Sequence, residues 1–370
     1  MLNLLITLKE NGFQSVLVCP PGQLHNRASQ LGINTINLVF PPVHIFFGFV
    51  PWFSVLTIIR LYYLILKNRI NIVHVESQLA LYYFGVAAWF ANIPCVATYH
   101  GYWQLKSRLA RVMLKHLCCR LYPVSKTTAQ DIYETGLMPD DRIRVIPLSF
   151  NSQFLIDLPT KQECRISFGL PIDIPIVMQI ARFQSIKGQM ILLEALANLV
   201  QMQDGPIPIV VFVGDILDTT SNEAIMYKEF IKERAKRKDL QNHVCFLGWQ
   251  DNIPQLMRAA DIVVTPSDYE TFSMTTIEAM AVGTLVIATS SGGPAEIIQD
   301  ASIGVLIPPK APHILAKAIR NALSNPSRSV EIANKAKEFA IMNYSPQTRY
   351  NLMVKEYMEV LASKTRGKIL

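Results

Sequence analysis

The chain has 370 residues, of which 50% are hydrophobic and only 17% are charged, and its mean hydropathy is +0.24. At roughly 150 residues per domain, this length predicts two or three domains. The composition excludes a disordered chain, a collagen-like repeat and a disulfide-stabilised miniprotein. The six cysteines are scattered, without a CxxC pair or a nearby histidine cluster, which indicates reduced residues of an intracellular protein rather than a zinc site. The apolar run 2–8 is too short for a signal peptide.

The net charge of +7 is unevenly distributed along the chain. Residues 1–150 contain 13 basic and 6 acidic residues, whereas residues 151–370 contain 22 of each. Between Arg27 and Lys126 there are ten basic residues and one acid, Glu76. This half of the chain is therefore expected to face an anionic surface or ligand, such as phospholipid, nucleic acid or a phosphorylated substrate.

Short β-branched runs alternate with longer amphipathic stretches from a first helix at 2–11 onward. Strict alternation of strand and helix predicts parallel sheets with helices on both faces. A stretch rich in Pro and Gly at 150–172 predicts a linker. The expected fold is α/β, with two doubly wound domains facing each other across a cleft. The expected strands are 15–18, 35–39, 71–75, 95–99, 120–124, 144–147, 175–181, 207–214, 243–247, 262–265, 285–288 and 304–307, and the expected helices include 188–199, 221–238 and 312–323.

Two cations follow the expected strand 175–181. With Ser185 as the N-cap, Lys187 would lie in the first turn of the next helix, where a cation opposes the helix dipole unless an anion joins it. Together with Arg182 at the strand end, Lys187 would clamp a phosphate. The alternative is that both are solvated surface cations.

A second segment that could form part of a ligand-binding site runs from Pro266 to Ala281. A loop carrying Glu270 leads into a helix that starts near residues 273–275, whose free N–H groups would hold a diphosphate. For both acids a purely structural interpretation is the alternative. Glu278 would be the partner of Thr275 in a capping box, and Glu270 would be a solvated acid in a loop.

Two further features, a pair of glycines and a histidine, are weaker. Gly292 and Gly293 follow a strand and open a helix, which suits either close backbone approach to a ligand or an ordinary turn. No GxGxxG and no GxxxxGK[ST] motif occurs, so dinucleotide and P-loop chemistry are not indicated. His100 ends a buried strand, where open α/β sheets bind ligands, although a lone histidine is more often a packed residue.

Two stretches bear on membranes. Residues 45–66 are apolar except for Arg60, and we expect a buried helix with an interfacial edge, because Pro51 and Arg60 interrupt a spanning segment. Residues 105–120 alternate basic and aliphatic residues, which predicts a basic amphipathic helix suited to an anionic lipid surface or an ordinary solvated face.

Taken together, these segments resemble the retaining glycosyltransferases of family 4, which have the GT-B fold. The resemblance covers most of the chain and is strongest from 174 to 310. The motifs that carry it, in the order and spacing of the family, are Arg182…Lys187-Gly188, Phe246-Leu247-Gly248, Pro266-Ser267, Glu270…Glu278-Ala279-Met280-Ala281 and Gly292-Gly293…Glu296, extended by Tyr99-His100-Gly101.

The resemblance implies roles for individual residues. Arg182 and Lys187 would hold the diphosphate of a nucleotide sugar, Glu278 the ribose hydroxyls and Glu270 the donor sugar. His100 would reach the sugar from the other domain, so that Glu270, His100, Arg182 and Lys187 form the catalytic set. No metal or cofactor would be needed, because fixed cations and a helix N-terminus stabilise the departing diphosphate. The remaining donor contacts would come from the backbone of Phe272, Ser273, Met274 and Thr275, and from the loop between Gly248 and Ile253, which would line the base.

The resemblance also implies the domain organisation. Residues 1–160 would form the acceptor-side domain, 170–345 the nucleotide-sugar domain, and 346–370 a helix that packs back toward the first. The family's first strand and glycine-rich loop would precede Met1, and Thr271 stands where glycine is usual.

The sequence thus predicts a glycosyltransferase that moves a sugar from a UDP- or GDP-sugar to a glycolipid or polysaccharide acceptor. It would work at the cytoplasmic face of a membrane, peripherally bound to anionic lipid. The alternatives are a GT-B nucleotide-sugar epimerase and a truncated nucleotide-sugar-binding protein without turnover. Nucleic-acid binding is not expected, because the basic residues are interleaved with aliphatic runs.

Overall fold

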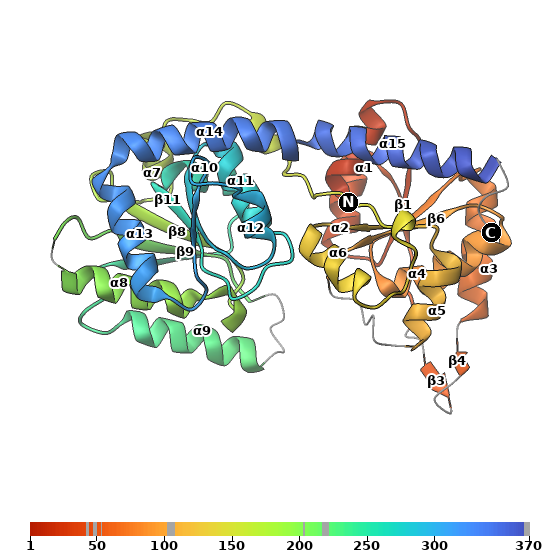
Figure 1. Cartoon of the computed structure of the whole chain (residues 1–370), viewed down its shortest axis with the longest axis horizontal. Helices are drawn as coiled ribbons and strands as arrows, with labels where there is room; N and C mark the ends of the chain where they lie inside the picture. The colour runs from red at the N-terminus through yellow and green to blue at the C-terminus, as the bar shows by residue number, and fades with distance from the viewer. Residues whose placement is uncertain are drawn as a thin grey trace. The chain divides into compact units, whose positions relative to one another are not determined.

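The computed structural model describes residues 1–41, 44–46, 50–52, 54–101, 108–202, 204–216 and 222–365. The chain divides into two units, one made of Met1–Leu148 and Pro346–Leu370 and the other of Ser149–Ser345 (Figure 1). The expected linker at 150–172 therefore falls within the second unit, where it contains a short helix, α7 (Lys161–Ser167), with a Thr160–Glu163 capping box.

The second unit is built on one six-stranded parallel sheet in the order β10-β9-β8-β11-β12-β13. The chain therefore runs outward from β8 in one direction and then returns to β11, which makes the gap between β8 and β11 the topological switch point. The strands are β8 (Ile176–Ile180), β9 (Ile209–Val213), β10 (Val244–Gly248), β11 (Ile262–Thr265), β12 (Leu285–Thr289) and β13 (Val305–Ile307).

Helices cover both faces of this sheet (Figure 1). The helices are α8 (Gln189–Met202), α9 (Asn222–Ala235), α10 (Ile253–Ala259), α11 (Met274–Val282), α12 (Gly293–Ile297), α13 (Pro312–Ser324) and α14 (Pro326–Tyr344). α8 packs on α13 and α9 on one side, and α11 packs on α10 and α14 on the other. The central strands are buried on both faces, which explains why they form continuous aliphatic runs in the sequence. All six strands expected for this unit are confirmed to within two residues at each end.

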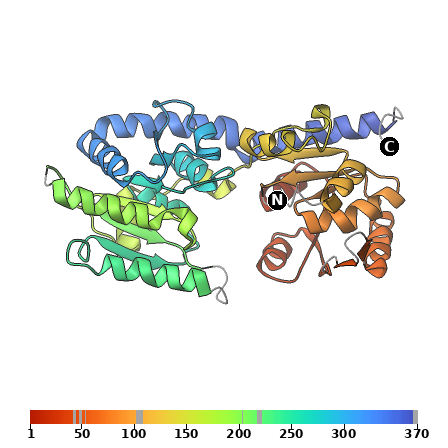
Figure 2. The ribbon, with the colours of Figure 1, turned by 60° about the horizontal axis from the view of Figure 1, so that its bottom comes forward.

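The first unit contains a parallel three-stranded sheet, β5-β6-β7, and a separate parallel pair, β1-β2. Its C-terminal helix packs along its first helix (Figure 2), with Met353 and Val360 buried against Leu4 and Leu8. The elements are α1 (Leu2–Glu10), β1 (Val16–Cys19), α2 (Gln23–Gln30), β2 (Asn34–Asn37), β3 (His44–Phe46), β4 (Val50–Trp52), α3 (Val55–Lys67), β5 (Val73–Val75), α4 (Gln78–Phe90), β6 (Cys95–Tyr99), α5 (Arg108–Leu117), β7 (Arg120–Pro123), α6 (Lys126–Tyr133) and α15 (Pro346–Thr365).

Two sequence predictions for this unit are wrong. Residues 144–147 form no regular strand, although the amides of Arg144 and Ile146 donate to carbonyls of β7. Residues 45–66 are not one buried helix, because β3 and β4 form an antiparallel hairpin and α3 begins only at Val55. α3 buries one face through Thr57, Leu61 and Ile65 and exposes the other.

Some predictions fall outside the described residues, namely the start of the basic helix at 105–107 and Ser221 at the start of 221–238. Among the helices that the structure describes, none is long and apolar enough to cross a bilayer.

Candidate functional site

The predicted donor-site residues of the second unit all lie at one edge of its sheet. Arg182 follows β8, Gly248 ends β10, and the loop carrying Glu270 follows β11. Because the strands are parallel, their carboxyl ends meet at the same edge, and the loops after β8 and β11 flank the switch point. Ligands of open α/β sheets bind in that position.

The segment that carries Lys187 is a 3₁₀ turn, Ser185–Lys187, and α8 starts only at Gln189. The prediction that Ser185 caps a helix with Lys187 in its first turn is therefore wrong. Gly188 turns the chain with a φ of +71°, and a Cβ there would lie 2.1 Å from the carbonyl oxygen of Pro266. This close approach requires glycine, and it brings the Lys187 turn against the loop after β11.

Lys187 and Glu270 form an ion pair across these two loops. The Lys187 Nζ lies 2.7 Å from the Glu270 Oε1, and the two side chains are only 17% and 12% exposed. The Ser267 hydroxyl donates to the same carboxylate oxygen at 2.8 Å. Both alternatives, a solvated cation and a solvated loop acid, are therefore wrong. Because an ammonium has three N–H donors, Lys187 can bind a second anion while Glu270 holds it.

Arg182 has a buried donor without a partner. Its backbone carbonyl accepts from the side chain of Gln189 at 2.8 Å, but its buried Nε makes no hydrogen bond within the described part of the chain. An unsatisfied buried N–H costs about 1–3 kcal/mol. An anion at this edge of the sheet would remove that cost, since guanidinium groups suit phosphate oxygens.

The N-terminus of α11 is left without a side-chain cap. Ser273 at the N-cap position has a left-handed φ of +81°, and its hydroxyl pairs with that of Thr276 instead of a backbone N–H. A non-glycine residue in this conformation costs on the order of 1 kcal/mol and marks functional loops. Met274 and Thr275 follow in the first turn, whose N–H groups carry the positive end of the helix dipole.

Glu278 is not a capping residue. The Thr275 hydroxyl donates to the carbonyl of Ile180 at 3.3 Å, and no capping box forms at this helix. Burial raises the pKa of Glu278 to about 8, and no described residue donates a hydrogen bond to its carboxyl group. A partly buried acid without a cationic neighbour, one turn into a helix at the switch point, is a candidate ligand-binding group.

The glycine pair positions the acidic loop. The Gly293 amide donates to the carbonyl of Glu270 at 2.8 Å, and a Cβ at Gly293 would lie 2.1 Å from the carbonyl oxygen of Phe272. Phe272 is buried, and its ring contacts that of Tyr344. These glycines pack closely on the protein's own backbone at the turn from β12 into α12, which fixes the loop from Glu270 to Phe272. Close approach of their backbone to a ligand stays a prediction.

The loop between Gly248 and Ile253 lies at the same sheet edge. The Gly214 amide donates to the Gly248 carbonyl at 2.7 Å, and α10 begins at Ile253. Trp249 in this loop is 59% exposed. Its assignment to the base of a nucleotide stays a prediction.

His100 lies in the first unit, where it follows β6. It is not a lone histidine, because its Nε2 lies 2.6 Å from the Oε2 of Glu76, which follows the neighbouring strand β5. The sequence interpretation missed this pairing. The available signal was that Glu76, the only acid between Arg27 and Lys126, also stands at the end of an expected strand.

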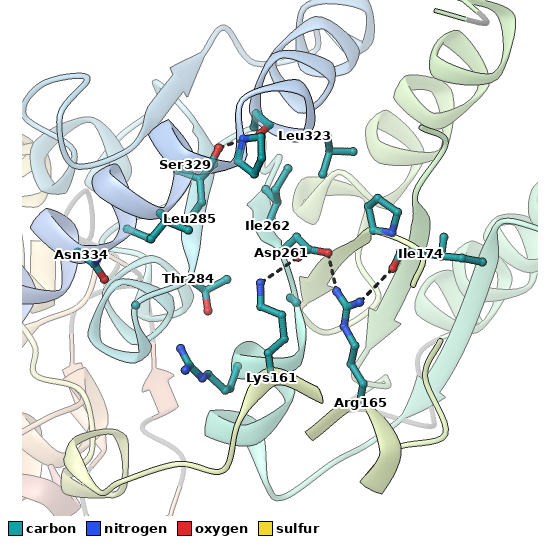
Figure 3. A pocket seen from close by; sticks show the side chains of 18 of the residues that line it. Lys161, Arg165, Ile174, Asp261, Ile262, Thr284, Leu285, Leu323, Ser329 and Asn334 are labelled. Atoms are coloured by element: carbon teal, nitrogen blue, oxygen red, sulfur yellow. Dashed lines mark hydrogen bonds and ion pairs between the residues drawn. The ribbon is translucent and has the colours of Figure 1, made fainter. Parts of the chain in front are cut away.

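A cavity of about 580 Å³ lies at the opposite, amino-terminal edge of the second unit's sheet (Figure 3). Asp261 there accepts hydrogen bonds from Lys161 at 2.9 Å, from Arg165 at 2.6 Å and from the Ile176 amide at 2.7 Å. These charges satisfy one another, and no predicted site residue lines the cavity. In the part of the chain that the structure describes, no cluster of His, Cys, Asp and Glu could hold a metal ion.

Comparisons with known proteins agree with this architecture. Residues 160–339 match the family model of glycosyl transferases group 1, and residues 1–153 match that of glycosyltransferase family 4. Among solved structures, the chain is similar to a glycosyltransferase from Rickettsia africae, with a TM-score of 0.86, 23% identity, and coverage of 97% of this chain and 93% of that one. It is also similar to Anabaena HepE in complex with UDP-glucose, with a TM-score of 0.81, 22% identity, and coverage of 97% and 95%.

Sequence relatives include a D-inositol 3-phosphate glycosyltransferase from Corynebacterium urealyticum, 27% identical over 56% of this chain and 48% of the relative. Another is the lipopolysaccharide core biosynthesis glycosyltransferase LpsE from Rhizobium meliloti, 26% identical over 54% of this chain and 53% of the relative. The chain spans about half the length of the curated relatives it matches. The expected family and fold class are thus confirmed: the chain belongs to glycosyltransferase family 4 and has the GT-B fold.

Proposed function

We propose that this protein is a retaining glycosyltransferase that moves a sugar from a nucleotide sugar to a glycolipid or polysaccharide acceptor without a metal ion. The observation that carries the proposal is the grouping at the switch point of the second unit. Three features lie at the same edge of the sheet: a buried Arg182 Nε without a partner among the described residues, the Lys187–Glu270 pair, and the N-terminus of α11, which has no side-chain cap. Fixed donors and dipoles of this kind stabilise negative charge on a departing diphosphate.

In the proposed reaction, the bond between the sugar anomeric carbon and the diphosphate oxygen breaks, and its electron pair stays on the diphosphate. The acceptor hydroxyl oxygen forms the new bond to the anomeric carbon on the same face, and its proton passes to the leaving phosphate. Arg182 and Lys187 stabilise the developing phosphate charge, while Glu270 orients the sugar.

The donor and acceptor classes are supported by the relatives. HepE is described in complex with UDP-glucose, which favours a UDP-sugar as donor over a GDP-sugar. LpsE is described as acting in lipopolysaccharide core biosynthesis, which favours a glycolipid acceptor. Glu278 would bind the ribose hydroxyls, and the loop from Gly248 to Ile253 would line the base.

The proposed site of action is the cytoplasmic face of a membrane. α3 exposes an apolar stripe that includes Leu56 at 74% and Tyr63 at 65% exposure, and Phe90 at the end of the adjacent α4 is 62% exposed. On α5, Arg111 and Lys115 are also exposed. Exposed apolar residues and exposed cations of the same unit suit the boundary of an anionic bilayer.

Calorimetric titration with UDP, GDP and ADP tests the donor site. We expect one nucleotide to bind, and Lys187→Ala to weaken that binding at least about tenfold, because a charge-assisted hydrogen bond contributes about 1.5–3 kcal/mol. Lys317→Ala, which removes an exposed lysine of the same unit, serves as the matched control and should bind like wild type. If no nucleotide binds, or if both variants bind equally, the assignment of the phosphate site is wrong.

Transfer is tested with UDP-glucose and a lipid-linked oligosaccharide acceptor, with and without EDTA. We expect an α-linked product from the α-configured donor, formed equally in EDTA. A nucleotide-sugar isomer that accumulates without acceptor would instead indicate an epimerase, and nucleotide binding without turnover would indicate a binding protein.

The membrane proposal has its own assay, co-sedimentation with vesicles that contain anionic phosphatidylglycerol. Leu56→Ser with Tyr63→Ser should reduce binding at all salt concentrations, whereas Arg111→Gln with Lys115→Gln should reduce it mainly at low salt. Binding of both variants equal to wild type would overturn the assignment of this surface.

A further inference from the structure

Glu76 and His100 are brought together by the register of the first unit's sheet. β5 pairs with β6 in parallel, with Val75 opposite Ala97, so the residues that follow the two strands emerge at the same edge. The Glu76 Oε2 lies 2.6 Å from the His100 Nε2. The His100 side chain remains 30% exposed, and its Nδ1 has no hydrogen-bond partner among the described residues.

Glu76 also accepts the last of a series of hydrogen bonds in which Tyr357 donates to His74, His74 to Thr98, and Thr98 to Glu76. The Thr98 hydroxyl donates to the Glu76 Oε1 at 3.3 Å, so its oxygen is left to accept from the His74 Nε2 at 2.7 Å. The His74 Nδ1 then accepts from the Tyr357 hydroxyl on α15 at 2.5 Å. Burial lowers the pKa of His74 to about 4. His74 is therefore neutral at physiological pH, as this pattern of one donor and one acceptor nitrogen requires.

The pKa of Glu76 lies well below its usual range. Burial is the largest single influence and would raise the pKa, but the hydrogen bond from His100 together with nearby positive charges, that of the Met1 amino group first, outweighs burial. An ionised carboxylate only accepts hydrogen bonds, so the His100 Nε2 must carry a hydrogen. In neutral His100 the free Nδ1 is consequently an acceptor.

We propose that Glu76 is a positioning residue that holds His100 in the Nε2–H tautomer, so that the exposed His100 Nδ1 accepts a hydrogen bond from a hydroxyl of a sugar substrate. The proposal rests on the proposed glycosyl transfer for the role of His100, but the tautomer itself depends only on the first unit. The tautomer and orientation of an imidazole are commonly set by the partner of its second nitrogen.

Glu76→Gln is a sharp test because the network dictates how a glutamine would sit. Thr98 still needs an acceptor at Oε1, so the amide nitrogen takes the place of Oε2 and donates to His100. His100 must then switch to the Nδ1–H tautomer, which turns Nδ1 from an acceptor into a donor. Glu76→Asp keeps the carboxylate and should retain the wild-type tautomer.

Long-range ¹H–¹⁵N correlation spectra of the ¹⁵N-histidine-labelled 370-residue chain report the tautomer directly at about pH 8. His100→Ala assigns the His100 signals, and Glu134→Gln, at an exposed acid of the same unit, is the matched control. We expect the Nε2–H form in wild type, Glu76→Asp and the control, and the Nδ1–H form in Glu76→Gln. A wild-type Nδ1–H form, or no change in Glu76→Gln, would overturn the proposal.

Turnover links the tautomer to function. With UDP-glucose as donor, we expect Glu76→Gln to lower kcat about tenfold or more, with unchanged UDP affinity, since one substrate hydrogen bond is reversed. In a His100→Ala background the same substitution should cost nothing further, whereas a purely structural role would add to the loss. Additive losses would overturn the positioning role. Failure of the proposed function can be distinguished from failure of the positioning role. In that case the wild-type protein would not bind UDP or transfer sugar, but Glu76→Gln would still change the tautomer of His100.

Discussion

Replacement of Glu278 by glutamine is expected to change the pH dependence of stability. Burial raises the pKa of Glu278 from 4.5 to about 8 in the folded protein. As the pH rises above 4.5, the unfolded chain releases this proton while the folded protein keeps it, so stability falls between about pH 4.5 and 8 and is constant above that range. Glutamine cannot ionise, and Glu278→Gln removes this loss.

The magnitude follows from the two pKa values. A difference between 4.5 and about 8 is equivalent to roughly 5 kcal/mol at full ionisation, at 1.36 kcal/mol for each pKa unit. The Glu278 side chain keeps part of its surface accessible, and solvent screens part of that penalty. We therefore expect the unfolding free energy of Glu278→Gln, relative to wild type, to rise by about 2 kcal/mol between about pH 5 and pH 9.

Urea unfolding followed by circular dichroism at several pH values measures this difference. Glu338→Gln, at an exposed acid on α14, is the control and should track wild type at every pH. A difference between Glu278→Gln and wild type that stays constant with pH would show that Glu278 is ionised in the folded protein near neutrality, which would refute the reasoning.

The same pKa makes nucleotide affinity depend on pH. If ribose hydroxyls donate to the carboxylate, only ionised Glu278 binds them, and at pH 7 roughly one site in ten is ionised for a pKa of about 8. UDP affinity should then rise about tenfold from pH 7 to pH 9 in wild type. In Glu278→Gln it should be weaker and independent of pH over that interval, as calorimetry can check.

Three further substitutions test the second unit. Arg182→Met removes a buried N–H that has no partner among the described residues. We therefore expect the free energy of unfolding to stay equal or rise by up to about 1 kcal/mol, and UDP affinity to fall. A loss of stability would show that Arg182 has a structural partner. Asp261→Asn weakens the contact to Arg165, which is 6% exposed, and should cost about 2–3 kcal/mol in urea unfolding without affecting UDP binding. Gly293→Ala would place a Cβ 2.1 Å from the Phe272 carbonyl oxygen. This should displace the Glu270 loop and lower kcat with UDP-glucose more than it lowers UDP affinity, and unchanged transfer would contradict that role.

The second unit could be predicted from sequence because its strands are buried on both faces. Aliphatic runs such as 207–214 and 285–288 have no polar alternation that could suggest another structure, and the glycines between strand and helix mark the ends. The apolar stretch 45–66 was misassigned for the opposite reason. Its apolar residues did not reveal that Pro51 belongs to a hairpin or that Leu56 and Tyr63 face solvent on α3, because exposure depends on which neighbours pack against a helix.

For the candidate site, the spacing of residues in the sequence predicts their location in the fold, whereas the partner of each charged group depends on tertiary contacts. Arg182, Lys187, Glu270 and the start of α11 could be assigned to one sheet edge, because parallel strands in alternation with helices bring their carboxyl ends together. The partner of each charge could not be assigned in this way. Glu270 is neutralised by Lys187, 83 positions away in the chain, and local spacing carries no information about such a contact.

The two partly buried acids of the candidate sites show how the effect of burial on the pKa depends on the groups around the carboxylate. Glu278 is largely buried and accepts no hydrogen bond from the described residues, so its pKa rises. A ligand whose hydroxyls donate to the carboxylate would favour loss of that proton. Burial would raise the pKa of Glu76 as well, but the hydrogen bond from His100 and nearby positive charges, that of the Met1 amino group first, hold it below its usual range, so Glu76 stays ionised. The glutamate proposed to bind ribose hydroxyls thus accepts no hydrogen bond from the described residues, whereas the glutamate proposed to orient a histidine accepts hydrogen bonds from two of them. The hydrogen bonds to Glu76 come from residues 22 and 24 positions away, and the Met1 charge from farther still. Two glutamates can therefore be assigned to candidate sites from the sequence, but their protonation states depend on tertiary contacts.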